Sequence, residues 1–247
     1  MVEVRNLRKR FGPVAAVDGV SFAALDGQIT GLLGENGAGK TTTLAMIGGV
    51  LKPDDGSIRI DGADTRSSQD GRRELGALLD HKTLYSRLTA RENIRYFGEL
   101  QGLPAADLDE RVSSTLSLLG LDGLADRRAG GFSQGERMKV ALGRAVVHGP
   151  RNLLLDEPTN GLDIPAVRAL RGWLRGMRDR GICILFSSHV LEDVLALCDR
   201  IVIISKGRVV ADGAADAICR HADCATLEDA FVRLTAPGSV QPCLPTA

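Results

Sequence analysis

Two patterns of hydrophobic positions divide the chain. Over roughly the first sixty residues, apolar side chains alternate with polar ones, which is the pattern of strands that bury one face only. The alternating apolar positions are Val2 and Val4, Val20 and Phe22, and Ile58 and Ile60. The dipeptides Asp26-Gly27 and Asp61-Gly62 are typical of turns. This part of the chain therefore predicts antiparallel strands.

Later hydrophobic runs are short and continuous. They are Ile-Thr-Gly-Leu-Leu at 29–33, three leucines at 153–155, the run at 182–186 and the run at 201–204. Runs of this kind are expected of strands covered on both faces in a parallel sheet. The sequence therefore predicts an α/β fold with a parallel core beside the antiparallel part.

Between these runs the apolar spacing becomes helical. Thr89 and Glu92 have the spacing of a capping box, and so do Ser133 and Glu136. An apolar stripe that ends before Gly120 is formed by Leu108, Val112, Leu116 and Leu119. Residues 86–150 are therefore expected to form a helical insertion.

The predicted boundaries are one compact unit over residues 1–217 and a short C-terminal helix and tail over 218–247. Thr226 can cap the helical segment that follows it, and the polar, proline-containing end is expected to be disordered. We find no internal repeat.

Composition narrows the class of protein. The 247 residues are 44% hydrophobic, enough for a sizeable core, and the 31 basic residues balance the 31 acidic ones. A balanced chain has no overall field toward a nucleic-acid backbone, so a nucleic-acid partner is disfavoured. The apolar runs are far shorter than a membrane helix, and the first residues lack a signal-peptide core, so we expect a cytoplasmic protein.

Cysteine usage suggests neither a disulfide framework nor a metal site. The five cysteines stand at positions 183, 198, 219, 224 and 243, and a disulfide scaffold is not expected in a cytosolic protein of this size. Cys219, His221 and Cys224 lie close together, but their spacing matches no zinc pattern. A helical surface is the simpler interpretation of this segment.

The candidate chemistry begins directly after the first continuous run. The segment fits the pattern G-x-x-x-x-G-K-[ST] between a predicted strand and a predicted helix, as a phosphate-binding loop requires. Glycines allow backbone N–H groups to approach phosphate oxygens, Lys40 adds a charge near the β and γ phosphates, and Thr41 offers a hydroxyl to Mg²⁺. The predicted binding residues are Gly34, Glu35, Asn36, Gly37, Ala38, Gly39, Lys40, Thr41 and Thr42. The alternative is a glycine-rich turn.

Polar residues at the ends of two other core strands complete the candidate site. The run at 153–155 ends in Asp156 and Glu157, which lie beside the phosphate loop if the two strands are neighbours. Asp156 would then hold the Mg²⁺ shell, and Glu157 would polarise the attacking water. His189 follows the run at 182–186, where its imidazole could reach the γ-phosphate or orient the water with Glu157. A turn or a surface histidine is the structural alternative.

The order of these segments resembles the ATP-binding cassette ATPases over residues 2 to about 213. The resemblance rests on the phosphate loop, the helical insertion, Phe-Ser-Gln-Gly-Glu at 132–136, Leu-Leu-Leu-Asp-Glu-Pro-Thr-Asn-Gly-Leu-Asp at 153–163 and Ser-Ser-His at 187–189. It implies a P-loop fold with a β-rich core and a helical subdomain, and ATP with Mg²⁺ as ligands. Phe11 would stack on adenine beside Val17, and Asp163 would line a subunit interface. Ser133 and Gly135 would contact the γ-phosphate bound by a second subunit.

Two segments depart from the family pattern. The segment at 132–136 corresponds to the family's signature segment, which usually reads Leu-Ser-Gly-Gly-Gln. Here it reads Phe-Ser-Gln-Gly-Glu, which keeps Ser133 and one glycine. Where the family carries a glutamine near the metal, this chain has Asp80, which could also bind Mg²⁺. The variant loop and the C-terminal segment look most like export cassettes, notably the sodium-efflux and drug-efflux ATPases.

The resemblance also implies partners. We expect an ATP-dependent dimer of two copies, or of this chain with another cassette, on the inner face of the cell membrane. Hydrophobic membrane-spanning permease subunits would contact the loop around Asp80 and Tyr85. Two alternatives are a cassette ATPase that acts on nucleic acid or ribosomes, and a small nucleotide kinase or GTPase; the chain lacks an Asn-Lys-x-Asp guanine motif.

Overall fold

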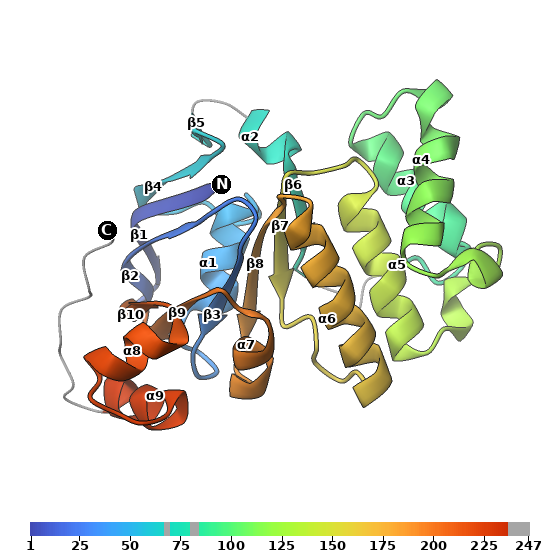
Figure 1. Cartoon of the computed structure of the whole chain (residues 1–247). Helices are drawn as coiled ribbons and strands as arrows, with labels where there is room; N and C mark the ends of the chain where they lie inside the picture. The colour runs from blue at the N-terminus through green and yellow to red at the C-terminus, as the bar shows by residue number, and fades with distance from the viewer. Residues whose placement is uncertain (67–69, 80–83, 237–247) are drawn as a thin grey trace.

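A computed structural model of the chain describes residues 1–66, 70–79 and 84–236. Its N-terminal part contains an antiparallel sheet in the order β2-β1-β4-β5 (Figure 1). The strands are β1 (Val2–Phe11), β2 (Val14–Ala24), β4 (Asp55–Ile60) and β5 (Ala63–Asp64). Val2 pairs with Ala24 on one side and with Ile60 on the other. The predicted antiparallel strands are confirmed.

A larger sheet has the order β10-β9-β3-β8-β7-β6. Its strands are β3 (Ile29–Leu33), β6 (Leu75–Leu78), β7 (Asn152–Asp156), β8 (Cys183–Ser188), β9 (Arg200–Ser205) and β10 (Arg208–Gly213). The strands from β9 to β6 run parallel, and β10 joins β9 antiparallel. The predicted parallel strands are confirmed, but β3 and β7 are not neighbours because β8 lies between them. The edge strands β6 and β10 were not predicted.

The helix α1 (Lys40–Ile47) packs between the two sheets, where its Leu44, Met46 and Ile47 share a core with side chains of both (Figure 1). On the other face of the larger sheet, α6 (Ile164–Asp179) and α7 (Leu191–Leu197) form a second core. Successive residues of β8 enter different cores, Leu185 the first and Phe186 the second. Both faces of the parallel sheet are therefore covered, which explains the continuous apolar runs.

The helices α3 (Ala90–Leu100), α4 (Ala105–Leu118) and α5 (Gln134–Val146) gather on one side of the sheets (Figure 1) and lie within the predicted insertion. Two 3₁₀ turns, η1 (Asp122–Leu124) and η2 (Ala129–Gly131), connect α4 to α5, and the short α2 (Asp70–Arg73) precedes β6. Both predicted capping boxes are present, from Thr89 to Glu92 and from Ser133 to Glu136. The local sequence therefore sets where α3 and α5 begin.

The C-terminal part contains α8 (Ala215–His221) and α9 (Leu227–Thr235). Thr226 caps α9, since its hydroxyl accepts a hydrogen bond from the Asp229 N–H at 3.1 Å. The predicted boundary between residues 217 and 218 falls inside α8. The segment predicted to be disordered is 236–247; its first residue, Ala236, donates its N–H to the Val232 carbonyl oxygen at 3.1 Å, and the rest lies outside the described residues. No helix in the described part of the chain is both long and apolar enough to cross a membrane.

Candidate active site

The loop from Gly34 to Gly39 connects β3 to α1 and lies close to neighbouring backbone. Gly39 caps α1 with a left-handed backbone of φ 107°. A Cβ on Gly39 would lie 2.4 Å from the carbonyl oxygen of Ala16, and a Cβ on Gly34 would lie 2.3 Å from that of Ile204. Both positions therefore require glycine. The loop leads into a helix N-terminus, whose unpaired N–H groups favour an anion.

Lys40, the first residue of α1, is buried with 5% of its surface exposed. Its Nζ donates to the carbonyl oxygens of Gly34 at 2.7 Å and Glu35 at 3.1 Å, and lies 3.7 Å from Glu157 Oε1. Burial lowers the pKa of Lys40 from its usual value, and the carboxylates of Glu157 and Asp156 oppose this shift. A triphosphate beside the ammonium would add negative charge and favour its charged form further.

Thr41 on α1 and Asp156 on β7 meet although β3, the strand before α1, is not adjacent to β7. Thr41 Oγ1 donates to Asp156 Oδ1 at 3.2 Å, because α1 packs against β7 and brings its first turn to the end of that strand. Hydroxyl and carboxylate oxygens are hard ligands of the kind that Mg²⁺ binds together with nucleotide phosphates. The donor atoms at this edge of the sheet therefore fit a magnesium ion.

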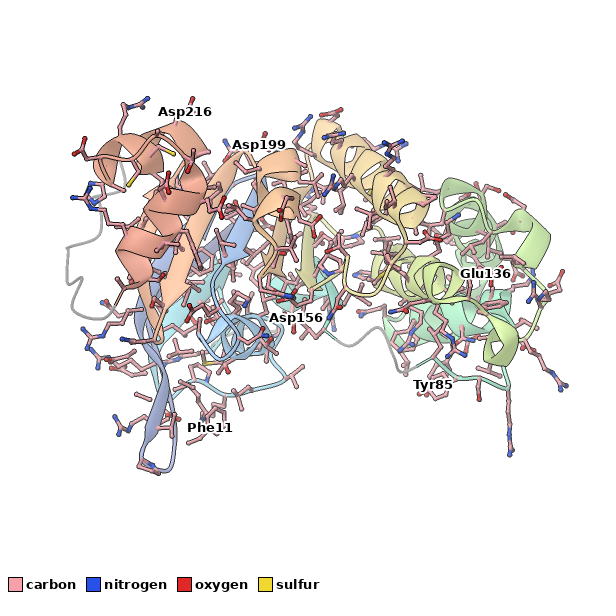
Figure 2. The ribbon with its side chains drawn as sticks, turned by 90° about the horizontal axis from the view of Figure 1, so that it is seen from below. Phe11, Tyr85, Glu136, Asp156, Asp199 and Asp216 are labelled. Atoms are coloured by element: carbon pink, nitrogen blue, oxygen red, sulfur yellow. The ribbon has the colours of Figure 1, made fainter. Side chains whose placement is uncertain are left out.

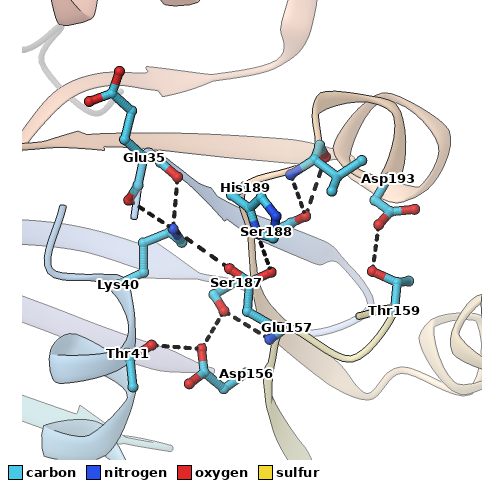
Figure 3. A network of polar contacts seen from close by, with 12 residues as sticks. Glu35, Lys40, Thr41, Asp156, Glu157, Thr159, Ser187, Ser188, His189 and Asp193 are labelled. Atoms are coloured by element: carbon cyan, nitrogen blue, oxygen red, sulfur yellow. Dashed lines mark hydrogen bonds and ion pairs between the residues drawn. The ribbon is translucent and has the colours of Figure 1, made fainter. Parts of the chain in front are cut away.

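Ser187, near the end of β8, connects the two carboxylate residues (Figure 3). Its hydroxyl donates to Asp156 Oδ1 and accepts from the Glu157 N–H at 3.0 Å. The side chain is fully buried. Sequence reasoning did not predict this residue, although a hydroxyl at the end of a buried apolar strand requires a buried hydrogen-bond partner and was therefore a usable signal.

Glu157 and His189 form a direct pair. His189 Nδ1 lies 2.8 Å from Glu157 Oε2 (Figure 3), and because an ionised carboxylate only accepts hydrogen bonds, Nδ1 carries the proton. Glu157 has a φ of 48°, in the left-handed region that residues with a side chain rarely adopt. Strained backbone of this kind clusters at functional sites. The structure thus brings both predicted catalytic residues together beside Lys40.

Half of the predicted nucleotide-binding residues, together with both predicted catalytic residues, line one pocket of about 540 Å³. Its lining consists of Phe11, Ala16, Asn36, Gly37, Gly39, Lys40, Thr41, Thr42, Glu157, Asn160 and His189. Ala16 and Asn160 were not predicted. Phe11, at the end of β1, is 50% exposed and stands apart from Asp156 across the site (Figure 2).

Four predicted residues of β2 and the phosphate loop do not line the pocket: Val17, Gly34, Glu35 and Ala38. Val17 is buried in the core between the sheets, since alternation along β2 turns its neighbour Ala16 to the pocket instead. Ala38 is also buried, and its carbonyl oxygen accepts from the Gly207 N–H at 2.9 Å. Sequence spacing alone did not show which side of β2 faces the ligand.

The three residues predicted to act at a subunit interface do not line this pocket. Ser133 caps α5, where its hydroxyl accepts from the Glu136 N–H at 3.3 Å, and Gly135 follows in the first turn. Figure 2 places Glu136 in the helical region, well separated from Asp156. Asp163 caps α6, accepting from the Ala166 N–H at 2.9 Å. Contact of Ser133, Gly135 and Asp163 with a second subunit remains a prediction.

One contact does connect the signature segment to the loop after β7. Gln134 Nε2 donates to the carbonyl oxygen of Asn160 at 3.2 Å. Gln134 stands where the family pattern has a glycine, so this contact depends on the departure noted in the sequence. It connects the start of α5 to a residue that lines the pocket.

Two other predicted positions concern metal binding. Asp80 lies outside the described residues, so its predicted role as a magnesium ligand is not placed. Cys219 and Cys224 pack against the larger core. Within residues 1–66, 70–79 and 84–236, no group of three or more histidine, cysteine, aspartate or glutamate side chains could hold a metal ion.

A phosphate loop with a buried lysine, a hydroxyl beside a strand-ending carboxylate, and a glutamate–histidine pair in one pocket define a P-loop nucleoside triphosphatase. The family model described as ABC transporter matches residues 17–160. A solved structure described as "Structure of ATP binding subunit of ABC transporter" superposes with a TM-score of 0.86 at 31% identity, covering 96% of this chain and 100% of that one.

Curated proteins of similar sequence are also named as ATP-binding proteins. The chain is 41% identical to "ABC transporter ATP-binding protein NatA" of Bacillus subtilis over 88% of this chain and 91% of the relative. It is 39% identical to "Nod factor export ATP-binding protein I" of Burkholderia lata, covering 88% of this chain and 72% of the relative. A "Sulfate/thiosulfate import ATP-binding protein CysA" of Synechocystis is 37% identical over 88% of this chain and 62% of its own length. The chain therefore belongs to the ABC transporter family and is an ATP-binding, ATP-hydrolysing subunit of this type.

Proposed function

We propose that the chain powers export through separate membrane-spanning subunits, working as an ATP-dependent dimer with Mg²⁺. The observation that carries the proposal is the single pocket that holds Lys40, Thr41, Glu157 and His189 beside Asp156. These groups fit the parts that phosphoryl transfer requires, which are a charged phosphate cradle, hard metal ligands and a carboxylate to orient water.

The chain's own residues divide this work. Lys40 and the loop N–H groups bind the β and γ phosphates, and Phe11 stacks on the base at the pocket edge. Glu157 takes a proton from the attacking water, and His189 holds the carboxylate through its Nδ1–H. Thr41 and Asp156 would hold Mg²⁺, which would supply positive charge to stabilise the phosphates during transfer.

The dimer explains why Ser133 and Gly135 stand apart from the pocket. A capped, exposed helix start is an anion site, and a second subunit can bring the γ-phosphate of its own ATP to it. Moving an equilibrium from mostly open to mostly closed takes about 5.5 kcal/mol, which two nucleotides can supply by contacting the closed state better than the open one. Hydrolysis then removes the bridging phosphate and releases the pair.

The permease contact is proposed at the loop before α3. Tyr85 is 47% exposed and packs edge-on against Tyr96, with ring centroids 5.4 Å apart. Tyr96 is itself 39% exposed. Exposed apolar and aromatic side chains in one region are typical of a protein interface. This surface belongs to the helical region, so its movement would be passed to the membrane subunits.

The test of the active-site and dimer proposal is Glu157→Gln. Because the amide cannot take a proton, we expect ATP to bind but not to turn over, so that light scattering shows the mass of a dimer when ATP is added. Glu110→Gln, an exposed substitution on α4, is the control and should hydrolyse ATP normally. Normal hydrolysis by Glu157→Gln, or a monomer at saturating ATP, would contradict the proposal.

The cargo is proposed to be Na⁺ or a drug-like compound, from the resemblance to efflux cassettes and from a relative named for export. A multi-span membrane subunit should be sought among the neighbouring genes, co-expressed with the chain and assayed in inside-out vesicles. ATP-driven uptake of radioactive sodium or of a fluorescent drug would support export of that cargo. ATP-driven loss of a preloaded compound would indicate import.

A further inference from the structure

A buried polar cluster lies behind the glutamate–histidine pair. Asp193, on α7, is 5% exposed and Thr159, in the loop after β7, is 8% exposed. The Thr159 hydroxyl donates to Asp193 Oδ2 at 2.5 Å (Figure 3), and an Arg171 guanidinium N–H on α6 donates to Asp193 Oδ1 at 2.6 Å. Each oxygen of the carboxylate therefore has its own donor, and the buried charge is paired.

The cluster joins the two loops that carry the proposed catalytic residues. Thr159 follows Glu157 by two positions, and Asp193 follows His189 by four. The loops thus meet at two points, once where Glu157 contacts His189 and once where Thr159 contacts Asp193. Two connections fix the relative orientation of two segments better than one, because a single contact leaves rotation about it free.

The strained backbone of Glu157 requires contacts that hold it, and the second connection is one of them. A left-handed φ of 48° on a glutamate persists only where surrounding contacts hold it. One such contact is the Ser187 hydroxyl, which accepts the Glu157 N–H. Thr159 restrains the chain on the other side of Glu157. The two restraints together prevent the loop from relaxing into an ordinary conformation.

We propose that Asp193 is a positioning residue that holds the Glu157 loop against the His189 loop through Thr159, with Arg171 stabilising its charge. The proposal rests on the proposed roles of Glu157 and His189. Asp193 does not line the pocket. Its effect is therefore expected in the turnover step and not in ATP binding.

The test compares Asp193→Asn with a matched variant elsewhere. Asp212 on β10 is 7% exposed and pairs with Arg200 at 2.7 Å, so it is an equally buried Asp–Arg pair. Arg200 begins β9, at the end of the sheet opposite the site. Both variants remove the negative charge from a buried Asp–Arg pair. Asp212 Oδ2 has no hydrogen-bond partner in the described part of the chain, so the NH₂ group of Asp212→Asn can avoid a donor, whereas that of Asp193→Asn must face one. Urea unfolding of each variant therefore sets the conditions in which both are folded before their kinetics are compared.

The two variants should differ in kinetics. Because misplacing a catalytic group by about 1 Å can cost about 10²-fold in rate, Asp193→Asn should lower kcat about 10²-fold and change the KM for ATP by less than about threefold. Asp212→Asn should keep wild-type kcat wherever it is folded. Equal kcat in the two folded variants, or a fall in ATP affinity that matches the fall in kcat, would overturn the proposal.

A second pair of variants tests the proposal while the buried Asp193–Arg171 pair stays in place. Thr159→Val removes the hydroxyl at nearly constant volume and leaves the Asp193–Arg171 pair intact, whereas Thr159→Ser restores the hydroxyl. We expect kcat to fall in the valine variant and to recover in the serine variant. No difference between them would overturn the proposal. A Glu157→Gln protein that still hydrolyses ATP would instead refute the assignment of the base, which distinguishes the two failures.

Discussion

Ser187→Ala tests whether the hydroxyl of β8 organises the carboxylates of β7. The substitution removes a hydrogen bond donated to Asp156 Oδ1 and one accepted from the Glu157 N–H. The alanine methyl occupies the same fully buried position, so little packing is lost. Any effect beyond a small one therefore comes from the two hydrogen bonds.

The magnitude follows from the chemistry of each bond. A hydrogen bond to a charged carboxylate contributes about 1.5–3 kcal/mol, and leaving a buried N–H unsatisfied costs about 1–3 kcal/mol. The two effects share one hydroxyl, so we expect a loss of about 3 kcal/mol in the free energy of unfolding. The Glu157 backbone also loses a contact that holds its left-handed φ, so kcat should fall about 10²-fold through misplacement of the carboxylate.

Urea unfolding and steady-state ATP hydrolysis measure the two effects separately. Thr65→Val is the control, because the Thr65 side chain is also buried and donates one hydrogen bond, to the Ile58 carbonyl oxygen at 3.2 Å, away from the site. It should lose about 1 kcal/mol and keep its kcat. The reasoning is refuted if Ser187→Ala loses no more stability than Thr65→Val, or if its folded form turns over ATP at the wild-type rate.

Three further predictions concern other buried or connecting groups. The Thr30 hydroxyl on β3 is fully buried and has no hydrogen-bond partner within the described part of the chain, so Thr30→Val should leave stability unchanged or raise it by about 1 kcal/mol in urea unfolding. Burial raises the pKa of Cys183 from 9.0 to about 11, so the unfolded chain releases this proton first and this thiol alone should cost the wild type about 3 kcal/mol as the pH rises from about 9 to about 11. Burial also raises the pKa of Cys198, which destabilises both the wild type and Cys183→Ser over the same pH range, so the total loss in Cys183→Ser should be smaller than that of the wild type by about 3 kcal/mol. Gln134→Ala removes the exposed hydrogen bond to Asn160, which contributes about 1 kcal/mol. We expect its loss to raise the barrier to turnover by this amount, so that kcat falls about fivefold while the melting temperature stays unchanged.

The features that depend on neighbouring residues were predictable from the sequence. Thr89 and Ser133 begin their helices as the capping-box spacing indicated, because a cap is formed by atoms within one turn. The alternation around Val4 and the continuous run that contains Leu185 assigned the two kinds of sheet, because burial of one or both faces leaves a direct pattern in the chain.

The features that depend on distant residues were not predictable. The four residues of β6, from Leu75, are too few to show a period, and their pairing with β7 joins segments far apart in the chain. The position of β8 between β3 and β7 depends on which crossovers pack best over the whole sheet. Asn160 escaped for the same reason, since only the tertiary structure brings it to the pocket. The hydroxyl of Ser187 at the end of a buried strand was a usable signal, but its partners could not be assigned because only the strand order brings them near.

The strand order itself accounts for the geometry of the site. If β3 and β7 were adjacent, the phosphate loop would meet Asp156 directly and β8 would lie to one side. With β8 between them, the residues that end β8 are placed between the Lys40 loop and the Asp156–Glu157 pair. Ser187 can then hold both carboxylate residues, and His189 can reach Glu157 from the same strand end. Three parallel strands whose carboxyl ends share one edge thus bring a cation, a metal-ligand pair and a carboxylate–imidazole pair into one pocket, which no two of them could supply.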